Sequence, residues 1–292
     1  MKISLGPIQY FWPKNRVIEF YDEIAGTAVD SVYLGEAICY KRTELRLQDW
    51  MSIARKLADR GKEVVLSTLT LLEAAAELHA VRKVCDNGEF MVEANDIAAV
   101  NLLAEANQSF VAGPSINIYN SRSLNYLYRV GMRRWVMPVE LGRDTLQAIL
   151  AELDNNATPE TEIFTYGRLP LAYSARCFTA RAHNLPKDRC ELKCLGYPDG
   201  LLLESQEEQT LFTLNGIQTQ SGDTCDLRPQ WREMEALGVD ILRISPQSTG
   251  TADIIAALHS AMKDNAPLPD NTGSCNGYWF GQSGLERVVS PE

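Results

Sequence analysis

The sequence predicts a (β/α)8 TIM-like barrel, and three observations favour that fold class. Short β-rich runs alternate with amphipathic segments through most of the chain, a pattern typical of a parallel sheet covered by helices. Eight such runs occur, and the 292 residues exceed the roughly 250 that such a barrel needs before insertions. No GxGxxG motif follows the first run, which disfavours the open dinucleotide-binding sheet.

Local patterns along the chain indicate the individual helices and strands. The first helical segment carries Val17, Phe20 and Ile24 at helical spacing, and TLLE at 70–73 has the form of a capping box. The segment 231–238 supplies the helix before the last strand. The expected strands are 2–6, 31–37, 63–68, 90–95, 109–120, 134–141, 162–171 and 239–246.

Two segments interrupt the alternation. Residues 172–228 form an insertion after the seventh strand, in which 201–205 and 210–214 have the pattern of a β-hairpin. Residues 264–292 are rich in Pro, Asn and Gly but contain neighbouring aromatic residues. We therefore expect a barrel over 1–263, with a C-terminal tail over 264–292 that docks on it.

Composition limits the classes of function and partner. The net charge is −10, and a phosphate backbone binds basic surfaces, so nucleic acid is not an expected partner. No apolar run is long enough for a transmembrane segment. The opening residues lack the pattern of a secretory signal, so we expect a cytoplasmic protein. The seven cysteines are an odd number that fits a disulfide framework poorly.

Four cysteines are predicted to meet at one rim of the barrel. Cys39 follows the second strand, whereas Cys177, Cys190 and Cys194 lie on the insertion after the seventh strand. Loops after the strands of a βα barrel converge on one face, where active sites lie. Spacing alone leaves three interpretations open: an iron–sulfur cluster, a zinc site, or unligated thiols.

Two motifs resemble peptidase family U32. They are YGRLPLAYSARC at 166–177 and CNGYWFG at 275–281, and the resemblance extends over essentially the whole chain, most closely to the ubiquinone-biosynthesis branch. The resemblance implies a [4Fe–4S] cluster held by Cys39, Cys177, Cys190 and Cys194. It also implies a heterodimer with a UbiU-like protein, whose substrate is a small aromatic quinone precursor and whose reaction is an oxygen-independent hydroxylation.

The chain lacks the common hydrolase motifs. GxSxG, HExxH and a Walker loop are absent, so a peptidase is the weaker alternative, carried only by a Cys177–His183 pair. Another alternative is a non-catalytic scaffold subunit whose fold is stabilised by the cluster. Polar residues at strand ends are the candidates for a substrate pocket, with Arg168 the preferred carboxylate ligand. These candidates are Glu36, Asn117, Glu140, Arg168 and Arg243.

Overall fold

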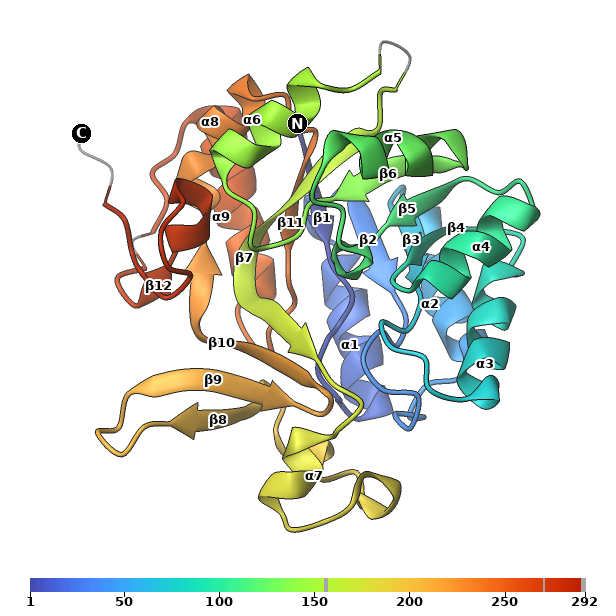
Figure 1. Cartoon of the computed structure of the whole chain (residues 1–292). Helices are drawn as coiled ribbons and strands as arrows, with labels where there is room; N and C mark the ends of the chain where they lie inside the picture. Colours follow the sequence, from blue (N-terminus) through green and yellow to red (C-terminus); the bar gives the residue numbers. More distant parts are fainter. Residues whose placement is uncertain (155–156, 270, 290–292) are drawn as a thin grey trace.

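The computed structural model describes residues 1–154, 157–269 and 271–289. Within these residues, eight parallel strands follow one another around a closed ring and the last pairs with the first, which confirms the predicted TIM-like barrel (Figure 1). The strands are β1 (Lys2–Leu5), β2 (Ser31–Leu34), β3 (Glu63–Ser67), β4 (Met91–Ala94), β5 (Phe110–Ala112), β6 (Met132–Val136), β7 (Glu160–Tyr173) and β11 (Ile241–Ile244).

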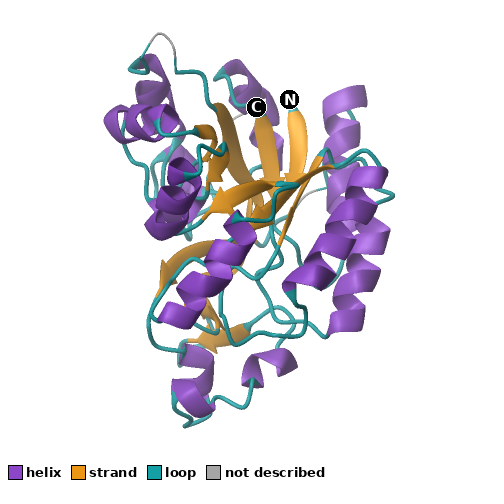
Figure 2. Ribbon diagram, turned by 90° about the vertical axis from the view of Figure 1, so that its right-hand side faces the viewer, coloured by secondary structure: helices purple, strands orange, loops and turns teal. Residues whose placement is uncertain are grey.

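Helices cover the outside of this ring (Figure 2). The helix expected at 231–238 is α8, directly before β11. The covering helices are α1 (Lys14–Ile24), α2 (Leu47–Asp59), α3 (Ala75–Cys85), α4 (Ile97–Glu105), α5 (Ser121–Arg129), α6 (Arg143–Ala151), α8 (Trp231–Ala236) and α9 (Thr251–Asp264). Among the described residues, no helix is long and apolar enough to cross a membrane.

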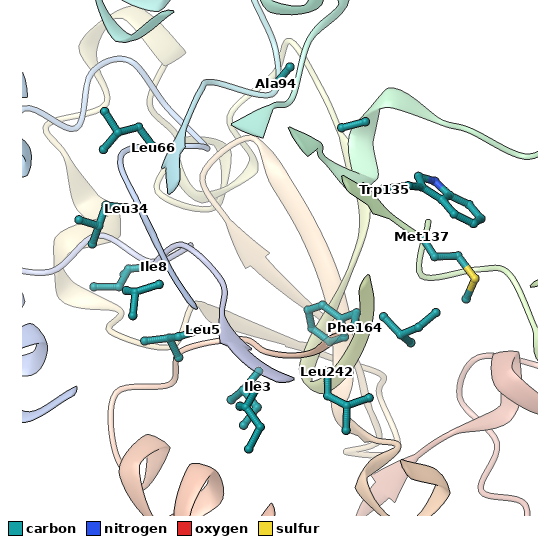
Figure 3. Packing of buried hydrophobic residues seen from close by; sticks show 14 of the residues in the cluster. Ile3, Leu5, Ile8, Leu34, Leu66, Ala94, Trp135, Met137, Phe164 and Leu242 are labelled. Atoms are coloured by element: carbon teal, nitrogen blue, oxygen red, sulfur yellow. The ribbon is translucent and has the colours of Figure 1, made fainter. Parts of the chain in front are cut away.

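The main hydrophobic core lies between the strands and the helices. Leu5, Leu34 and Leu66 leave successive strands on the outer face (Figure 3). Leu242 does so from β11, which is paired with β1, and Trp135 does so from β6. All five are buried. Because burying one such side chain contributes about 1.5–3 kcal/mol, this layer holds the helices on the barrel.

The interior of the barrel is charged. Arg243 of β11 donates to Glu93 of β4 (2.8 Å) and to Glu162 of β7 (2.6 Å), and its guanidinium lies over the Tyr33 ring. Glu162 also accepts hydrogen bonds from the hydroxyls of Ser4 and Tyr33. These side chains are buried, so their charges are balanced by one another instead of by water.

The insertion is built on an extension of β7. This strand continues beyond the ring and pairs antiparallel with β10 (Gln218–Asp226). The predicted hairpin is confirmed as β8 (Leu201–Glu204) and β9 (Thr210–Asn215). A short helix, α7 (Phe178–Ala182), precedes the hairpin, and both lie on the side of the barrel away from α5 and α6 (Figure 1).

The C-terminal segment contacts the body through a short strand and a tryptophan. The strand is β12 (Ser274–Cys275), which pairs parallel with β10. Trp279 is buried, and its indole N–H donates to Glu233 of α8 at 2.8 Å. Residues 270 and 290–292 of the expected tail, and 155–156 of the expected barrel, lie outside the described residues.

Several predicted boundaries are wrong. The strands expected at 31–37 and 134–141 end earlier, at Leu34 and Val136. The strand expected at 109–120 ends at Ala112 and continues as a 3₁₀ turn, η1 (Pro114–Ile116), because proline cannot donate to the strand ladder. The helix expected to open with the TLLE capping box begins at Ala75. Glu77 accepts hydrogen bonds from the backbone N–H groups of Glu73 and Ala74 there. The capping carboxylate is therefore that of Glu77, four residues after the Glu73 of the predicted box.

The charged interior leads to a prediction about acid stability. Burial raises the pKa of the Glu162 carboxyl. The positive charges of Arg243 and Arg134 lower this pKa by more than burial raises it, so it lies below the usual value. The ionised Glu162 carboxylate contributes its full stabilisation above its pKa in the unfolded chain, about 4.3. This stabilisation is lost as the pH falls toward the lower pKa that Glu162 has in the folded protein. We expect Glu162→Gln to lower the unfolding free energy at pH 7 by about 3 kcal/mol or more.

Urea unfolding at pH 7 and through the acid range measures both effects. The variant should lose less stability than the parent protein as the pH falls, since it lacks the titrating group. Glu19→Gln, at an exposed position of α1, is the control and should match the parent. Parallel stability curves for Glu162→Gln and the parent would contradict the assignment.

Candidate functional site

The loop after β2 presents Cys39 at the carboxyl rim of the barrel. Gly35 has φ +130°, and a Cβ there would lie 2.6 Å from the Ser67 carbonyl oxygen, so the chain can turn here only with glycine. Glu36 then accepts the backbone N–H groups of Ile38 (2.9 Å) and Cys39 (3.0 Å). The carboxylate therefore fixes the turn that carries the cysteine.

The insertion presents the other three cysteines. Cys177 is the N-cap of α7, and its sulfur accepts the N–H of Ala180 at 3.4 Å. Between Cys190 and Cys194 the backbone is left-handed at Glu191 (φ 50°) and Leu192 (φ 51°). Two such non-glycine residues cost about 1–3 kcal/mol each and cluster at functional sites. This strained turn directs both cysteines back toward the barrel.

The four sulfur-bearing side chains are neighbours. Cys39, Cys177 and Cys190 pack in a small cluster with Ile38 and Ile217 that is separate from the main core. Cys194 interacts electrostatically with Cys39, Cys177 and Cys190. Residues that lie far apart in the sequence thus meet at one rim, and we refer to these four cysteines as the thiol group.

Arg42 lies beside the thiol group. Its guanidinium is buried and donates to the Gln9 carbonyl (2.6 Å) and to Asn215 Oδ1 (2.7 Å), while Glu36 Oε1 lies 3.7 Å away. It also interacts electrostatically with Cys194, but its Nε has no partner among the described atoms. A buried cation that is not fully satisfied favours additional negative charge nearby.

Burial dominates the titration of Cys39 and Cys194. Desolvation raises the pKa of Cys39 to about 11, and the Arg42 charge opposes that rise. Desolvation likewise raises the pKa of Cys194, again opposed by Arg42. A metal that binds thiolate must displace these protons.

The residues fit a thiolate-ligated centre in their chemistry. Within the described ranges, no three His, Cys, Asp or Glu side chains are already arranged to hold a metal ion, and each of the four cysteines is a free thiol. Four sulfur donors are the set that iron–sulfur clusters and all-cysteine zinc sites use. The unpartnered Nε of Arg42 offers charge balance for an anionic centre of either kind.

A cavity of about 460 Å³ opens beside the thiol group at the mouth of the barrel. It is formed by the loops after β3, β5 and β6 and by the end of β7, and we call it the mouth cavity. Leu71 and Tyr173 line it and also pack against the thiol cluster, so the two share a wall. The other lining residues are Thr70, Pro114, Ser115, Asn117, Tyr119, Pro138, Val139, Glu140, Pro170, Leu171 and Ala172.

Two of the predicted pocket residues lie in the mouth cavity. Asn117 follows η1 in a left-handed conformation, and Glu140 follows β6. Tyr119 donates to Glu140 Oε2 at 2.7 Å, and desolvation together with this carboxylate raises the pKa of Tyr119 to about 12. Sequence reasoning did not identify Tyr119, although it lies two residues after Asn117 on the same loop.

The remaining predicted pocket residues have other partners. Arg168 donates to the backbone carbonyls of Asp199 (2.6 Å) and Gly222 (3.3 Å) and so fastens the insertion to β7. Arg243 belongs to the charged interior, with one unpartnered nitrogen, Nη2. Glu36 supports the Cys39 turn. His183, considered for a Cys–His pair, shares a hydrogen bond with the Tyr197 hydroxyl at 2.9 Å.

A second cavity lies on the outside of the barrel. It has a volume of about 550 Å³ between α2 and α3, and apolar side chains such as Trp50 and Val84 form most of its lining. Glu36 and Arg42 also contribute to its lining. Although this cavity is larger, it lies behind the Cys39 loop and outside the ring of strands. The mouth cavity occupies the position where barrel enzymes bind substrate.

The fold and the site define a (β/α)8 barrel protein with a thiol group on an insertion at its carboxyl rim. The chain belongs to peptidase family U32, whose family model matches residues 18–265. This confirms the family that the two motifs resemble.

Solved structures with similar folds include the U32 peptidase Mk0906, at 13% identity and a TM-score of 0.46 over 85% of this chain and 93% of that one. The spore cortex-lytic enzyme SleL from Bacillus megaterium QM B1551 is 10% identical, with a TM-score of 0.45 over 93% and 75%.

The Tyr119–Glu140 pair in the mouth cavity can be tested by titration. We expect Glu140→Gln to lower the pKa of the Tyr119 phenol from about 12 toward 10, because the anion that opposes ionisation is removed while burial remains. NMR of ring-labelled tyrosine measures the shift, and Tyr119→Phe assigns the resonance. An unchanged Tyr119 pKa would show that the two side chains do not interact in solution.

Proposed function

We propose that this chain is an iron–sulfur subunit that acts with a UbiU-like partner in the oxygen-independent hydroxylation of a quinone precursor. The observation that carries the proposal is the wall of Leu71 and Tyr173 shared by the thiol group and the mouth cavity. A redox centre held by the thiols would lie next to the site where a substrate binds. Within the family, the motifs of this sequence resemble those of the ubiquinone-biosynthesis protein UbiV.

Cys39, Cys177, Cys190 and Cys194 would hold a [4Fe–4S] cluster, which supplies electron transfer when bound. The chain's own residues prepare the site. Glu36 orients the Cys39 loop through two backbone N–H groups. The buried guanidinium of Arg42, interacting with Cys39 and Cys194, balances thiolate charge at the site.

The mouth cavity suits a small aromatic molecule. Its volume lies within the range of about 300–1,000 Å³ that is typical of ligand pockets. Pro114, Pro138 and Leu171 offer flat or apolar contacts, and Asn117 with the Tyr119–Glu140 pair offers polar ones. These groups can orient a ring that carries a hydroxyl or carboxylate.

The insertion also offers a surface for a partner protein. Leu203 of β8 and Phe212 of β9 are register partners, so they lie on the same face of the hairpin. Both are exposed, and β8 is an edge strand of the sheet. Exposed apolar side chains on an unpaired edge are features of interaction sites, which supports a heterodimer that uses this hairpin.

The cluster is tested by purifying the protein without oxygen and assaying iron, acid-labile sulfide and visible absorbance. We expect about four iron and four sulfide per chain, as a [4Fe–4S] centre requires. Cys39→Ala and Cys177→Ala should lose both, whereas Cys85→Ala, which removes a buried thiol at the end of α3, should retain them. A colourless protein that contains zinc, or a cluster that survives Cys39→Ala, would refute the assignment.

The mouth cavity is tested by quinone production in anaerobic cells that depend on this chain. We expect Asn117→Ala combined with Tyr119→Phe to retain the cluster and the partner but to lower production at least about tenfold, because the polar contacts that orient substrate are worth several kcal/mol. Tyr126→Phe, at an exposed position of α5, is the control. If the cavity variant produces quinone normally while the cysteine variants do not, the chain is a scaffold stabilised by its cluster.

A further inference from the structure

Two further cysteines, outside the thiol group, are register partners in neighbouring strands. Cys225 of β10 is the Cα partner of Cys275 in β12, and the two strands are parallel. Strands in a sheet lie about 4.7–4.9 Å apart, which falls within the Cα separation of about 4.4–6.8 Å that disulfides require. Register partners project from the same face, so the two sulfur atoms lie side by side.

The two thiols are already in contact. The two thiol side chains interact with each other, and they are 3% and 0% exposed, respectively. Both belong to the main hydrophobic core, whereas the thiol group forms a separate cluster. The pair is therefore distinct from the proposed cluster site.

The pair lies where the C-terminal segment is attached. β12 contains only two residues, so its ladder holds the segment by few backbone hydrogen bonds. Beyond it, Tyr278 and Trp279 pack against the loop after β6, where Gly142 leaves no room for a side chain. The same loop carries Glu140 of the mouth cavity. A covalent link at Cys275 would fasten the segment that borders this rim.

We propose that Cys225 and Cys275 form a reversible disulfide that fastens the C-terminal segment to the barrel. The oxidant is a low-molecular-weight disulfide such as glutathione disulfide. The Cys275 thiolate attacks one of its sulfur atoms and releases one thiol, and the Cys225 thiolate then attacks the mixed disulfide and releases the second. Two protein thiols lose two electrons and two protons, and the reagent gains them as two free thiols. Local opening of the short β12 strand gives the reagent access to the buried pair.

Peptide mapping of the full-length, folded chain tests this proposal. The protein is incubated with glutathione disulfide, alkylated, digested without reduction and analysed by mass spectrometry. We expect a linked peptide pair that contains Cys225 and Cys275 and that disappears after dithiothreitol. The oxidised protein should also melt several degrees higher, because the link closes a long loop in the unfolded chain.

Variants separate this pair from the other cysteines. Cys275→Ser should abolish both the linked peptide and the rise in Tm, and Cys85→Ser should behave as the parent protein does. The proposal is overturned if both cysteines are recovered as alkylated single thiols, if each carries glutathione, or if either is linked to a different cysteine. Because the map of the unsubstituted chain is decisive, the test stands even if Cys275→Ser does not fold.

Discussion

The arrangement of the rim depends on the hydrogen bonds of one buried guanidinium. Arg42 donates to the Gln9 carbonyl of the loop after β1 and to Asn215 at the end of β9, while it lies against Glu36 of the loop after β2. Gln9 Oε1 in turn accepts from Gln218 and Gln220 of β10. Two barrel loops and the insertion are thereby joined at one point, and this joint brings Cys39 to the cysteines of the insertion.

Buried charge is used differently at two depths of the barrel. In the interior, Arg243 and Arg134 are paired with carboxylates of several strands, so the network ties the ring together and has little freedom to act on a ligand. At the rim, Arg42 lies 3.7 Å from the Glu36 carboxylate, donates to two neutral oxygens and has thiols nearby. The site that can accept new negative charge is therefore at the rim.

The sequence predicted the fold well because the relevant signals are local. Alternating strand and helix periodicity located the eight barrel strands and the hairpin of the insertion. The strand at 109–120 was drawn too long because the β-rich pattern continues past Pro114, where the backbone leaves the ladder. TLLE has the local pattern of a capping box, but the carboxylate that caps this helix is that of Glu77.

The candidate site was only partly predictable. Proximity of the thiols followed from the rule that loops after strands share one face, and Asn117 and Glu140 followed from their positions at strand ends. Arg42, Tyr119 and the Cys225–Cys275 pair depend on side-chain contacts between segments distant in sequence, which no local pattern encodes. Arg243 was selected for its polarity, but this barrel has a charged interior, so polarity alone did not indicate a free binding group.

Diffraction at the iron absorption edge, on crystals grown without oxygen, tests the central claim most directly. We expect a single anomalous peak enclosed by the sulfur atoms of Cys39, Cys177, Cys190 and Cys194, with the barrel unchanged. An iron peak held by other residues, or an intact barrel in which Cys39 Sγ points away from the three cysteines of the insertion, would contradict it.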